Sequence, residues 1–336
     1  MSSSDTPSGA PAPGGASRLT TWHRDLFAAI TAWPWLRDAD EKVAAVVLPV
    51  YDRHRANPVV ELMHGGRWAG HSLHAALSDL PIGFWAGSVV LDVLGKDRAG
   101  STGLDPASTL SAAGIAAAAA TVATGATDWT VSDGEDRRVG LLHGMMNLAG
   151  TTLAAASLAA RVAGKRRPAQ ALGMAGMAVT AAAGYVGGHL VQGRGLMVNR
   201  VANTAGPNRW VKAVEETDLP DGATTGVTVE GRQVVLHRSG DVVYALDDLC
   251  SHAGGLLSRG EVVDCVISCP LHESLFDLRD GHIVRGPAHH PQPVLPTRIR
   301  NGWVEVRGSQ PRARGTRSGD APAEGRTRTR SAPTTT

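Results

Sequence analysis

Three runs of this sequence carry no charged residue over lengths that could cross a membrane. They cover residues 106–127, 139–160 and 168–193, which are 22, 22 and 26 residues long. A helix needs about 20 apolar residues to span the hydrocarbon core of a bilayer. A fourth and weaker run, residues 80–95, contains Asp92. We therefore predict four transmembrane helices. A soluble bundle is the alternative, because Ala, which is abundant in these runs, favours lipid only weakly.

The charge and cysteine counts exclude several classes of protein. The 336 residues include 33 Lys and Arg against 31 Asp and Glu, which argues against a nucleic-acid-binding protein that depends on phosphate contacts. Three Cys exclude a disulfide-rich secreted scaffold. The 40 Gly and the Ala-rich runs favour close helix packing and would permit a homodimer. Trp68, Trp85 and Trp129 lie near the ends of predicted spans, as interfacial anchors do.

The two ends of the chain differ from its middle. Residues 1–20 contain almost no large apolar side chain, so we expect disorder there, and they hold no apolar stretch of a secretory signal peptide. Residues 308–336 form a basic tail that we also expect to be disordered, with contact to acidic lipid headgroups as the alternative to a solvated tail. Between residues 21 and 67 the pattern predicts short helices ahead of the membrane, with Pro34 and Pro49 as helix breakers.

Residues 210–307 have a different character, because Val-rich stretches alternate there with polar residues. Three residue pairs typical of hairpin turns separate these stretches: Glu230-Gly231, Ser239-Gly240 and Asn301-Gly302. This pattern predicts a small all-β domain. The fold class is therefore a two-domain α + β chain. A four-helix transmembrane bundle over residues 68–200 precedes the β domain.

Four potential metal ligands lie in two short motifs of this β domain. The first motif holds Cys250 and His252, and the second holds Cys269 and His272. Two thiolates and two imidazoles suit a [2Fe–2S] cluster in which one iron carries two His. Each motif would then give its Cys to one iron and its His to the other. The same four donors also bind Zn²⁺ in a tetrahedral site, so zinc is the alternative.

The residues around these ligands resemble the Rieske ferredoxin family over residues 210–307. The resemblance rests on residues 250–255, 269–276 and 286–287. It implies a [2Fe–2S] cluster bound by the four Cys and His side chains, with the Ser274 hydroxyl hydrogen-bonded to a cluster sulfur. It also implies a third, proline-containing loop over the cluster. We expect the free imidazole edges to lie near the surface, where electrons would enter and leave.

Two departures from the family pattern concern the reduction potential. The position after the second His is usually Gly, and here it is Glu273, whose carboxylate is expected to lower the potential. Respiratory Rieske proteins join their loops by a disulfide, and Gly255 and Leu271 occupy those positions here. Both features indicate the ferredoxin type, in the lower part of the range of roughly −150 to +300 mV. We expect Cys265 to be a small buried residue rather than a ligand.

Residues 57–200 resemble a bacterial four-helix membrane domain of unknown function that is often fused to a C-terminal Rieske domain. The matching stretches are residues 64–83, 127–129, 137–147 and 187–195. No chemistry follows from this resemblance. It implies a multi-pass protein of the bacterial cell membrane.

The order of the predicted crossings places six ionisable residues at the end of the bundle that leads into the β domain. They are His71, His74, Asp79, Asp128, His143 and His189. Ionisable residues in membrane segments are functional candidates by default. Three interpretations stay open for them. They are a haem b or other metal site, a quinone pocket, and hydrogen bonding that ties helix ends together, such as His143 with Asn147.

Together these features predict a membrane-anchored electron carrier that works with a redox partner protein or a quinone. The alternatives are a quinone- or haem-linked oxidoreductase subunit and an iron–sulfur redox sensor. Only 64 residues follow His272, too few for the mononuclear-iron domain of a Rieske oxygenase, so we expect no stand-alone enzyme. The Lys and Arg counts on the two membrane sides nearly cancel. Since iron–sulfur clusters are normally loaded in the cytoplasm, we expect the Rieske domain on that side.

Overall fold

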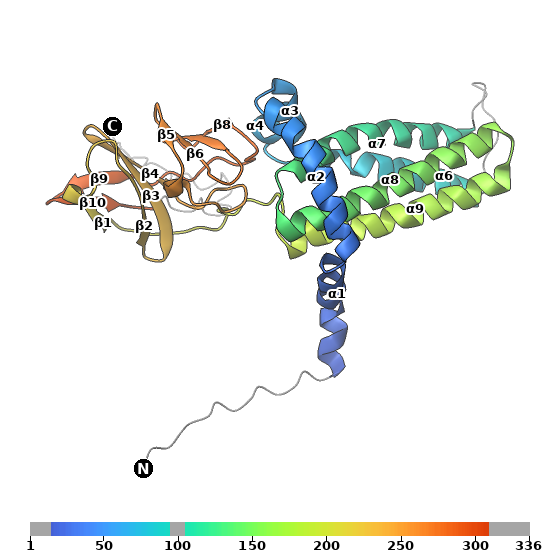
Figure 1. The fold of residues 1–336 in the computed structure, drawn as a ribbon, viewed down its shortest axis with the longest axis horizontal. Helices are drawn as coiled ribbons and strands as arrows, with labels where there is room; N and C mark the ends of the chain where they lie inside the picture. The colour runs from blue at the N-terminus through green and yellow to red at the C-terminus, as the bar shows by residue number, and fades with distance from the viewer. Residues whose placement is uncertain (1–14, 95–104, 309–336) are drawn as a thin grey trace, which may run out of the picture.

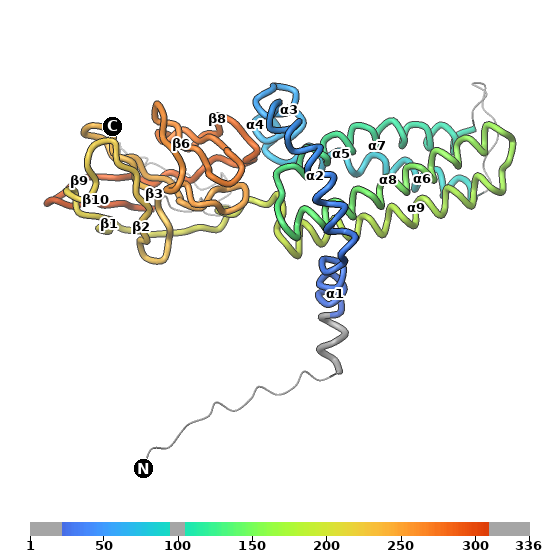
Figure 2. Tube along the Cα trace, in the orientation of Figure 1, coloured from blue at the N-terminus to red at the C-terminus, as the bar shows by residue number. Residues whose placement is uncertain are grey.

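The helical and β parts of the chain lie end to end (Figure 1). This computed structural model describes residues 15–94 and 105–308. The tail expected to be disordered after residue 308, and residues 1–14 of the N-terminal one, lie outside the described residues. One connection after residue 193 leads from the last helix to the first strand (Figure 2).

The helical part begins with one helix that projects from the bundle and a second that crosses it, and continues through three short helices into the bundle itself (Figure 1). Its elements are α1 (Gly15–Thr31), α2 (Pro34–His54), α3 (Pro58–His64), α4 (Gly66–Ala69), α5 (Leu73–Leu77), α6 (Asp79–Val93), α7 (Pro106–Thr130), α8 (Gly134–Val162), α9 (Arg166–Gly188) and a π-helical turn η1 (His189–Gly193).

Two expectations for the N-terminal segment are corrected by the structure. α1 begins at Gly15, inside the segment expected to be disordered, because helix formation is cooperative and the helix over later residues extends backwards. Pro34 starts α2, as a proline at the first helical position can, but Pro49 lies inside α2 and does not end it. α2 continues past Pro49, and its last turn is tied to α3 by the Tyr51 hydroxyl, which lies 2.9 Å from Nε2 of His64.

Small residues let the helices of the bundle approach closely. A Cβ atom on Gly150 of α8 would lie 2.4 Å from the Thr180 hydroxyl of α9. A Cβ atom on Gly114 of α7 would lie 2.3 Å from the indole nitrogen of Trp85 in α6. Helices in membranes pack in this way, since lipid supplies no hydrophobic force between them and close contact must do so.

Among the described residues, three helical segments are long and apolar enough to cross a membrane. They are Leu73–Val93, Pro106–Thr130 and Arg166–Gly193. The run predicted to be weak, around residues 80–95, is therefore one of the three, and its Asp92 pairs with Arg161 of α8. α8 is one continuous helix over the predicted run 139–160 but is not among the three, because polar residues such as Asn147 lower its mean hydropathy.

The β part forms three antiparallel sheets with the orders β1-β10-β9, β2-β3-β4 and β5-β6-β7-β8. The strands are β1 (Val211–Glu215), β2 (Thr224–Val229), β3 (Arg232–Ser239), β4 (Val242–Asp247), β5 (Val262–Val263), β6 (Val266–Ser268), β7 (Leu275–Asp277), β8 (Ile283–Arg285), β9 (Thr297–Arg300) and β10 (Trp303–Val306).

The predicted hairpins are confirmed, because β2–β3, β3–β4 and β9–β10 are each antiparallel neighbours. Glu230 and Gly231, and likewise Asn301 and Gly302, have positive φ, as a two-residue type I′ turn requires. The sheets enclose two apolar cores, and the second of these includes Cys250 and Cys269. The β domain therefore positions both motif thiols in its interior.

Candidate metal centre

The two Cys–His motifs form loops that fold with the same backbone hydrogen bonds. In the loop after β4, the Cys250 amide donates to the Gly255 carbonyl at 2.8 Å, and the Gly254 amide donates back to the Cys250 carbonyl at 2.9 Å. In the loop between β6 and β7, the Cys269 amide donates to the Ser274 carbonyl at 2.8 Å. Each loop is thus a closed turn that begins at a Cys.

Glu273 takes in the second loop the position that Gly254 takes in the first. Its amide donates to the Cys269 carbonyl at 2.9 Å. Gly254 has φ +77° and Glu273 has φ +57°, so both lie in the left-handed region. A side chain is disfavoured there by about 1–2 kcal/mol. This explains physically why the family pattern has Gly at this position and why Glu273 is a strained departure from it.

The two motif thiols meet inside the domain. Cys250 and Cys269 hydrogen-bond through their sulfurs, and they are 0% and 2% exposed. This bond, helped by the backbone amides of Leu271 and His272, lowers the pKa of Cys269, whereas the same bond and burial raise the pKa of Cys250. These donors favour a thiolate, which is the form of Cys that binds metals.

The two motif imidazoles lie against each other beside the thiols. The ring centres of His252 and His272 are 5.0 Å apart, and the rings are nearly perpendicular. Burial and the neighbouring His272 lower the pKa of His252 well below its usual value, so its imidazole is neutral, as a metal ligand must be. Nδ1 of His272 is buried and has no hydrogen-bond partner among the described residues. An orphaned nitrogen beside two thiols and a second imidazole fits the donor set of a Rieske cluster.

A third segment, after β8, ties the two loops together. The amide of Ala288 donates to the Ser274 hydroxyl at 3.0 Å. The side chain of Gln292 accepts from the Ser251 amide at 3.1 Å and donates to the Asp247 carbonyl at 2.7 Å. Sequence reasoning missed Gln292 and Ser251, because a buried amide far along the chain carries no local pattern that marks it as a brace.

The helical domain covers the histidine edge of this site. Nε2 of His272 lies 2.8 Å from a carboxylate oxygen of Asp133, in the turn between α7 and α8. Nε2 of His289, in the third segment, donates to the His64 carbonyl at 3.2 Å. His252 is 5% exposed and the His272 side chain is 11% exposed. The expectation that the imidazole edges lie near the surface is therefore wrong for His252, which is buried, whereas His272 lies at the edge of the contact beside the exposed Asp133. Neither motif contains a local pattern that indicates contact with the helical domain.

Further contacts around the site hold the two domains against each other. Arg55, directly after α2, pairs with Glu273 at 2.6 Å. A Cβ atom on Gly66 of α4 would lie 2.4 Å from the Ala288 carbonyl oxygen, so the backbones touch there. The cavity left beside His272 has a volume of about 20 Å³, which holds about one water molecule and no quinone ring.

A buried polar network lies in the helical domain directly behind this contact. Nδ1 of His64 and a carboxylate oxygen of Asp128 are 3.1 Å apart, and the Tyr51 hydroxyl lies 2.9 Å from Nε2 of His64. Ser72 donates to the other oxygen of Asp128. Burial raises the pKa of Tyr51 to about 12, so its hydroxyl stays protonated. Sequence reasoning found Asp128 but missed His64, which precedes the predicted spans.

The other ionisable residues predicted at this end of the bundle do not form one site. Nδ1 of His74 donates to the Thr121 carbonyl at 3.0 Å, and Nδ1 of His143 donates to the Ala183 carbonyl at 2.8 Å. Their ring centres are 6.2 Å apart, and Asn147 contacts the His143 ring as expected.

The remaining three predicted residues are separate from that pair. His71 bonds the Ser72 carbonyl, Asp79 lies in the first turn of α6, and His189 stacks on Phe27 of α1. The hydrogen-bonding interpretation accounts for His71, His74 and His143. Haem and quinone binding remain predictions.

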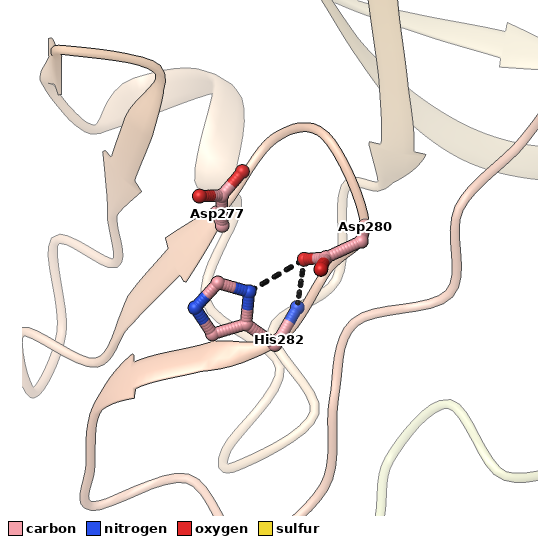
Figure 3. A group of neighbouring side chains, drawn as sticks. All are labelled: Asp277, Asp280 and His282. Atoms are coloured by element: carbon pink, nitrogen blue, oxygen red, sulfur yellow. Dashed lines mark hydrogen bonds and ion pairs between the residues drawn. The ribbon is translucent and has the colours of Figure 1, made fainter.

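Two groups of potential ligands lie outside the loops. Asp277, Asp280 and His282 gather in the turn between β7 and β8 (Figure 3). Their contacts are local, since His282 lies 2.6 Å from Asp280 and Arg279 pairs with Asp277, lowering the pKa of that carboxyl to about 2. Cys265 occupies the turn between β5 and β6 and is half-buried, whereas we expected it to be buried.

Comparison with known proteins agrees with this geometry. Residues 209–297 match the Rieske [2Fe-2S] domain, and residues 70–200 match a domain described as a predicted membrane protein (DUF2231). Over 98 residues the chain is 34% identical to the ferredoxin component of the naphthalene 1,2-dioxygenase system of Pseudomonas putida, covering 29% of this chain and 94% of that one. Over 75 residues it is 43% identical to the anthranilate 1,2-dioxygenase ferredoxin subunit of Burkholderia cepacia, covering 22% and 69%.

Among solved structures, the ferredoxin of carbazole 1,9a-dioxygenase from Nocardioides aromaticivorans IC177 is 32% identical, with a TM-score of 0.28 and coverage of 29% of this chain and 95% of that one. The sequence matches define the β domain as a ferredoxin-type electron-transfer domain that implies a [2Fe–2S] cluster. The chain belongs to the Rieske [2Fe–2S] family, in a fusion with a predicted membrane domain.

Two substitutions of Glu273 distinguish the effect of its negative charge on the reduction potential from the effect of its backbone strain on stability. We expect both Glu273→Gln and Glu273→Gly to raise the reduction potential, because each removes a negative charge beside His272. Both lose the ion pair with Arg55. Only the Gly variant relieves the left-handed strain, so it should be the more stable of the two by about 1 kcal/mol. Redox titration and thermal unfolding measure these effects, and a potential unchanged in both variants would contradict the electrostatic argument.

Proposed function

We propose that this chain is a membrane-anchored, low-potential Rieske electron carrier in which Cys250 and Cys269 bind one iron and His252 and His272 bind the other. The observation that supports it is the pair of matching loops, which bring two buried thiols and two imidazoles together beside an unpartnered Nδ1. When bound, the cluster accepts and releases one electron. The Ser274 hydroxyl accepts from the Ala288 amide, which leaves its own proton to donate to a cluster sulfur.

The anchor in this proposal is the bundle of α6, α7, α8 and α9, crossing the bacterial cell membrane four times. Three described segments meet the length and hydropathy needed, namely α5 together with α6, α7, and α9 together with η1. α8 packs closely on α9 at Gly150, and its Arg161 pairs with Asp92 of α6, so a charge in each helix is neutralised away from lipid. The Rieske domain then lies on the cytoplasmic side, where clusters are normally loaded.

Because the helical domain covers the imidazole edge, a redox partner cannot contact that edge directly in this arrangement of the domains. The relatives are ferredoxin components of dioxygenase systems, so a partner protein is the class we favour over a quinone. Because Asp133 covers Nε2 of His272, such a partner must displace the helical domain or exchange electrons through it. As an acceptor from the imidazole, the Asp133 carboxylate favours the oxidised cluster and so contributes to a low potential. The small cavity at His272 disfavours direct quinone contact at this point.

The ligand assignment predicts that His272→Ala loses the cluster but stays in the membrane fraction. One imidazole is one of four ligands, so its removal should abolish bound iron and visible absorbance. His282→Ala is the matched control, because His282 is exposed and lies in the same domain. Iron analysis of the purified proteins checks this. Wild-type iron content in His272→Ala would refute the assignment.

The docking contact predicts that Gly66→Ala exposes the cluster edge. The added methyl group would lie 2.4 Å from the Ala288 carbonyl oxygen, so the domains must move apart. We expect the reduced cluster to be oxidised several-fold faster by a soluble cytochrome c, with iron content unchanged. Gly83→Ala in α6 is the control, because nothing lies within 4 Å of its added Cβ. Stopped-flow rates that are equal in all three proteins would show that the contact does not limit access.

A further inference from the structure

α2 is fixed to the bundle through one of its faces. Asp40 is 3% exposed, and its carboxylate accepts bidentate hydrogen bonds from the Arg137 guanidinium of α8 at 2.8 to 3.1 Å. Leu36 and Ala44 lie one turn to either side of Asp40 and are also buried. Arg137 belongs to the first turn of α8, so α2 crosses the bundle near the end that carries the Rieske domain (Figure 1).

A second face of α2 is apolar over most of its length, and none of the described residues covers it. Its members recur at spacings of eight, three and four residues, which places them on one side of a helix. They are Trp35, Val43, Val46 and Val50, with exposures of 48%, 37%, 70% and 55%. The neighbouring arc carries the charged residues Arg37, Asp38, Glu41 and Lys42, and Arg53 lies at the C-terminal end of the apolar face itself. α2 therefore has two apolar faces. One packs against the bundle, and the other, formed by Trp35, Val43, Val46 and Val50, is exposed and is called the open face below.

The open face continues onto α1 and from there onto the bundle. Trp33, in the turn between α1 and α2, stacks on Trp35. Trp22 of α1 is 52% exposed and stacks on Tyr185 of α9, which is 46% exposed. Trp and Tyr concentrate at the headgroup level of membranes. The exposed aromatic groups thus join the outer surface of a candidate membrane helix to the open face of α2.

We propose that α1 and α2 lie in the plane of the membrane, with this open face immersed at the boundary between headgroups and acyl chains on the Rieske side. The proposal rests on the proposed function in one respect, since it takes the bundle helices as membrane crossings. α1 and α2 lie across the bundle axis, which is the orientation an interfacial helix needs (Figure 1). Charged residues on α2 include both signs in near balance, so apolar burial rather than anionic lipid drives the contact.

Spin labels on single cysteines test this in the whole protein. The background is Cys265→Ser, since Cys250 and Cys269 are held by the cluster. Val46→Cys reports the open face, Glu41→Cys reports the charged arc of the same helix, and the label is read in nanodiscs of zwitterionic lipid. The ratio of accessibility to oxygen over accessibility to a water-soluble nickel chelate measures immersion in lipid. Leu148→Cys, on an exposed position of α8, reports the bundle itself.

We expect a ratio at Val46→Cys that is several-fold higher than at Glu41→Cys and approaches that at Leu148→Cys. Equal, water-like ratios at positions 46 and 41 with a lipid-like ratio at 148 would overturn the interfacial placement and leave the membrane crossings intact. A water-like ratio at 148 would overturn the crossing of α8, and with it the four-helix anchor on which the placement rests. A label at 46 that neither reagent reaches would mean that protein, such as a second copy of this chain, covers the face, and would also overturn the proposal.

Discussion

The structure depends on the closure of two short turns, each of which begins at a cysteine and is held by two backbone hydrogen bonds. Without them Cys250 and Cys269 could not meet in the interior of the β domain while His252 and His272 meet beside them. The sheets supply the positions, since the second apolar core contains both thiols. Gln292 and the Ser274–Ala288 bond fix the turns to a third segment. The metal centre is thus built mainly by the backbone, and the side chains supply the donors.

In this chain the metal centre lies against the helical domain. Its imidazole edge is covered by the helical domain through Asp133, the His64 carbonyl and the close approach of Gly66. Glu273 has two consequences, because it strains its turn and also pairs with Arg55, directly after α2. A residue that departs from the family pattern is therefore part of the contact between the domains. The contact between the domains therefore covers the imidazole edge of the electron-transfer domain.

The sequence was sufficient for the β domain, because turn-forming residues and alternating apolar residues leave local patterns, and it indicated the four Cys and His side chains that the structure brings together. It was less reliable for the helices. Asp92 makes α6 a weak candidate for a membrane span by sequence, because its partner Arg161 lies far along the chain in α8. By contrast, the uncharged run in α8 predicts a span, but its mean hydropathy is too low to place α8 among the three candidate spans. The six ionisable residues were grouped by topology alone, and hydrogen bonds to helix carbonyls separate His74 and His143 from Asp128. The contacts of His64 and of the covered imidazole edge join residues more than 60 positions apart in the chain, so no local sequence pattern indicates them.

The most direct test is pulsed EPR of the dithionite-reduced protein in nanodiscs, prepared with and without ¹⁵N-labelled histidine. The account predicts a paramagnetic [2Fe–2S] signal with couplings from two histidine nitrogens that change on labelling, and an optical spectrum with no haem Soret band. A signal without nitrogen coupling would contradict the assignment of His252 and His272. Protein that contains zinc and gives no signal would contradict the cluster itself.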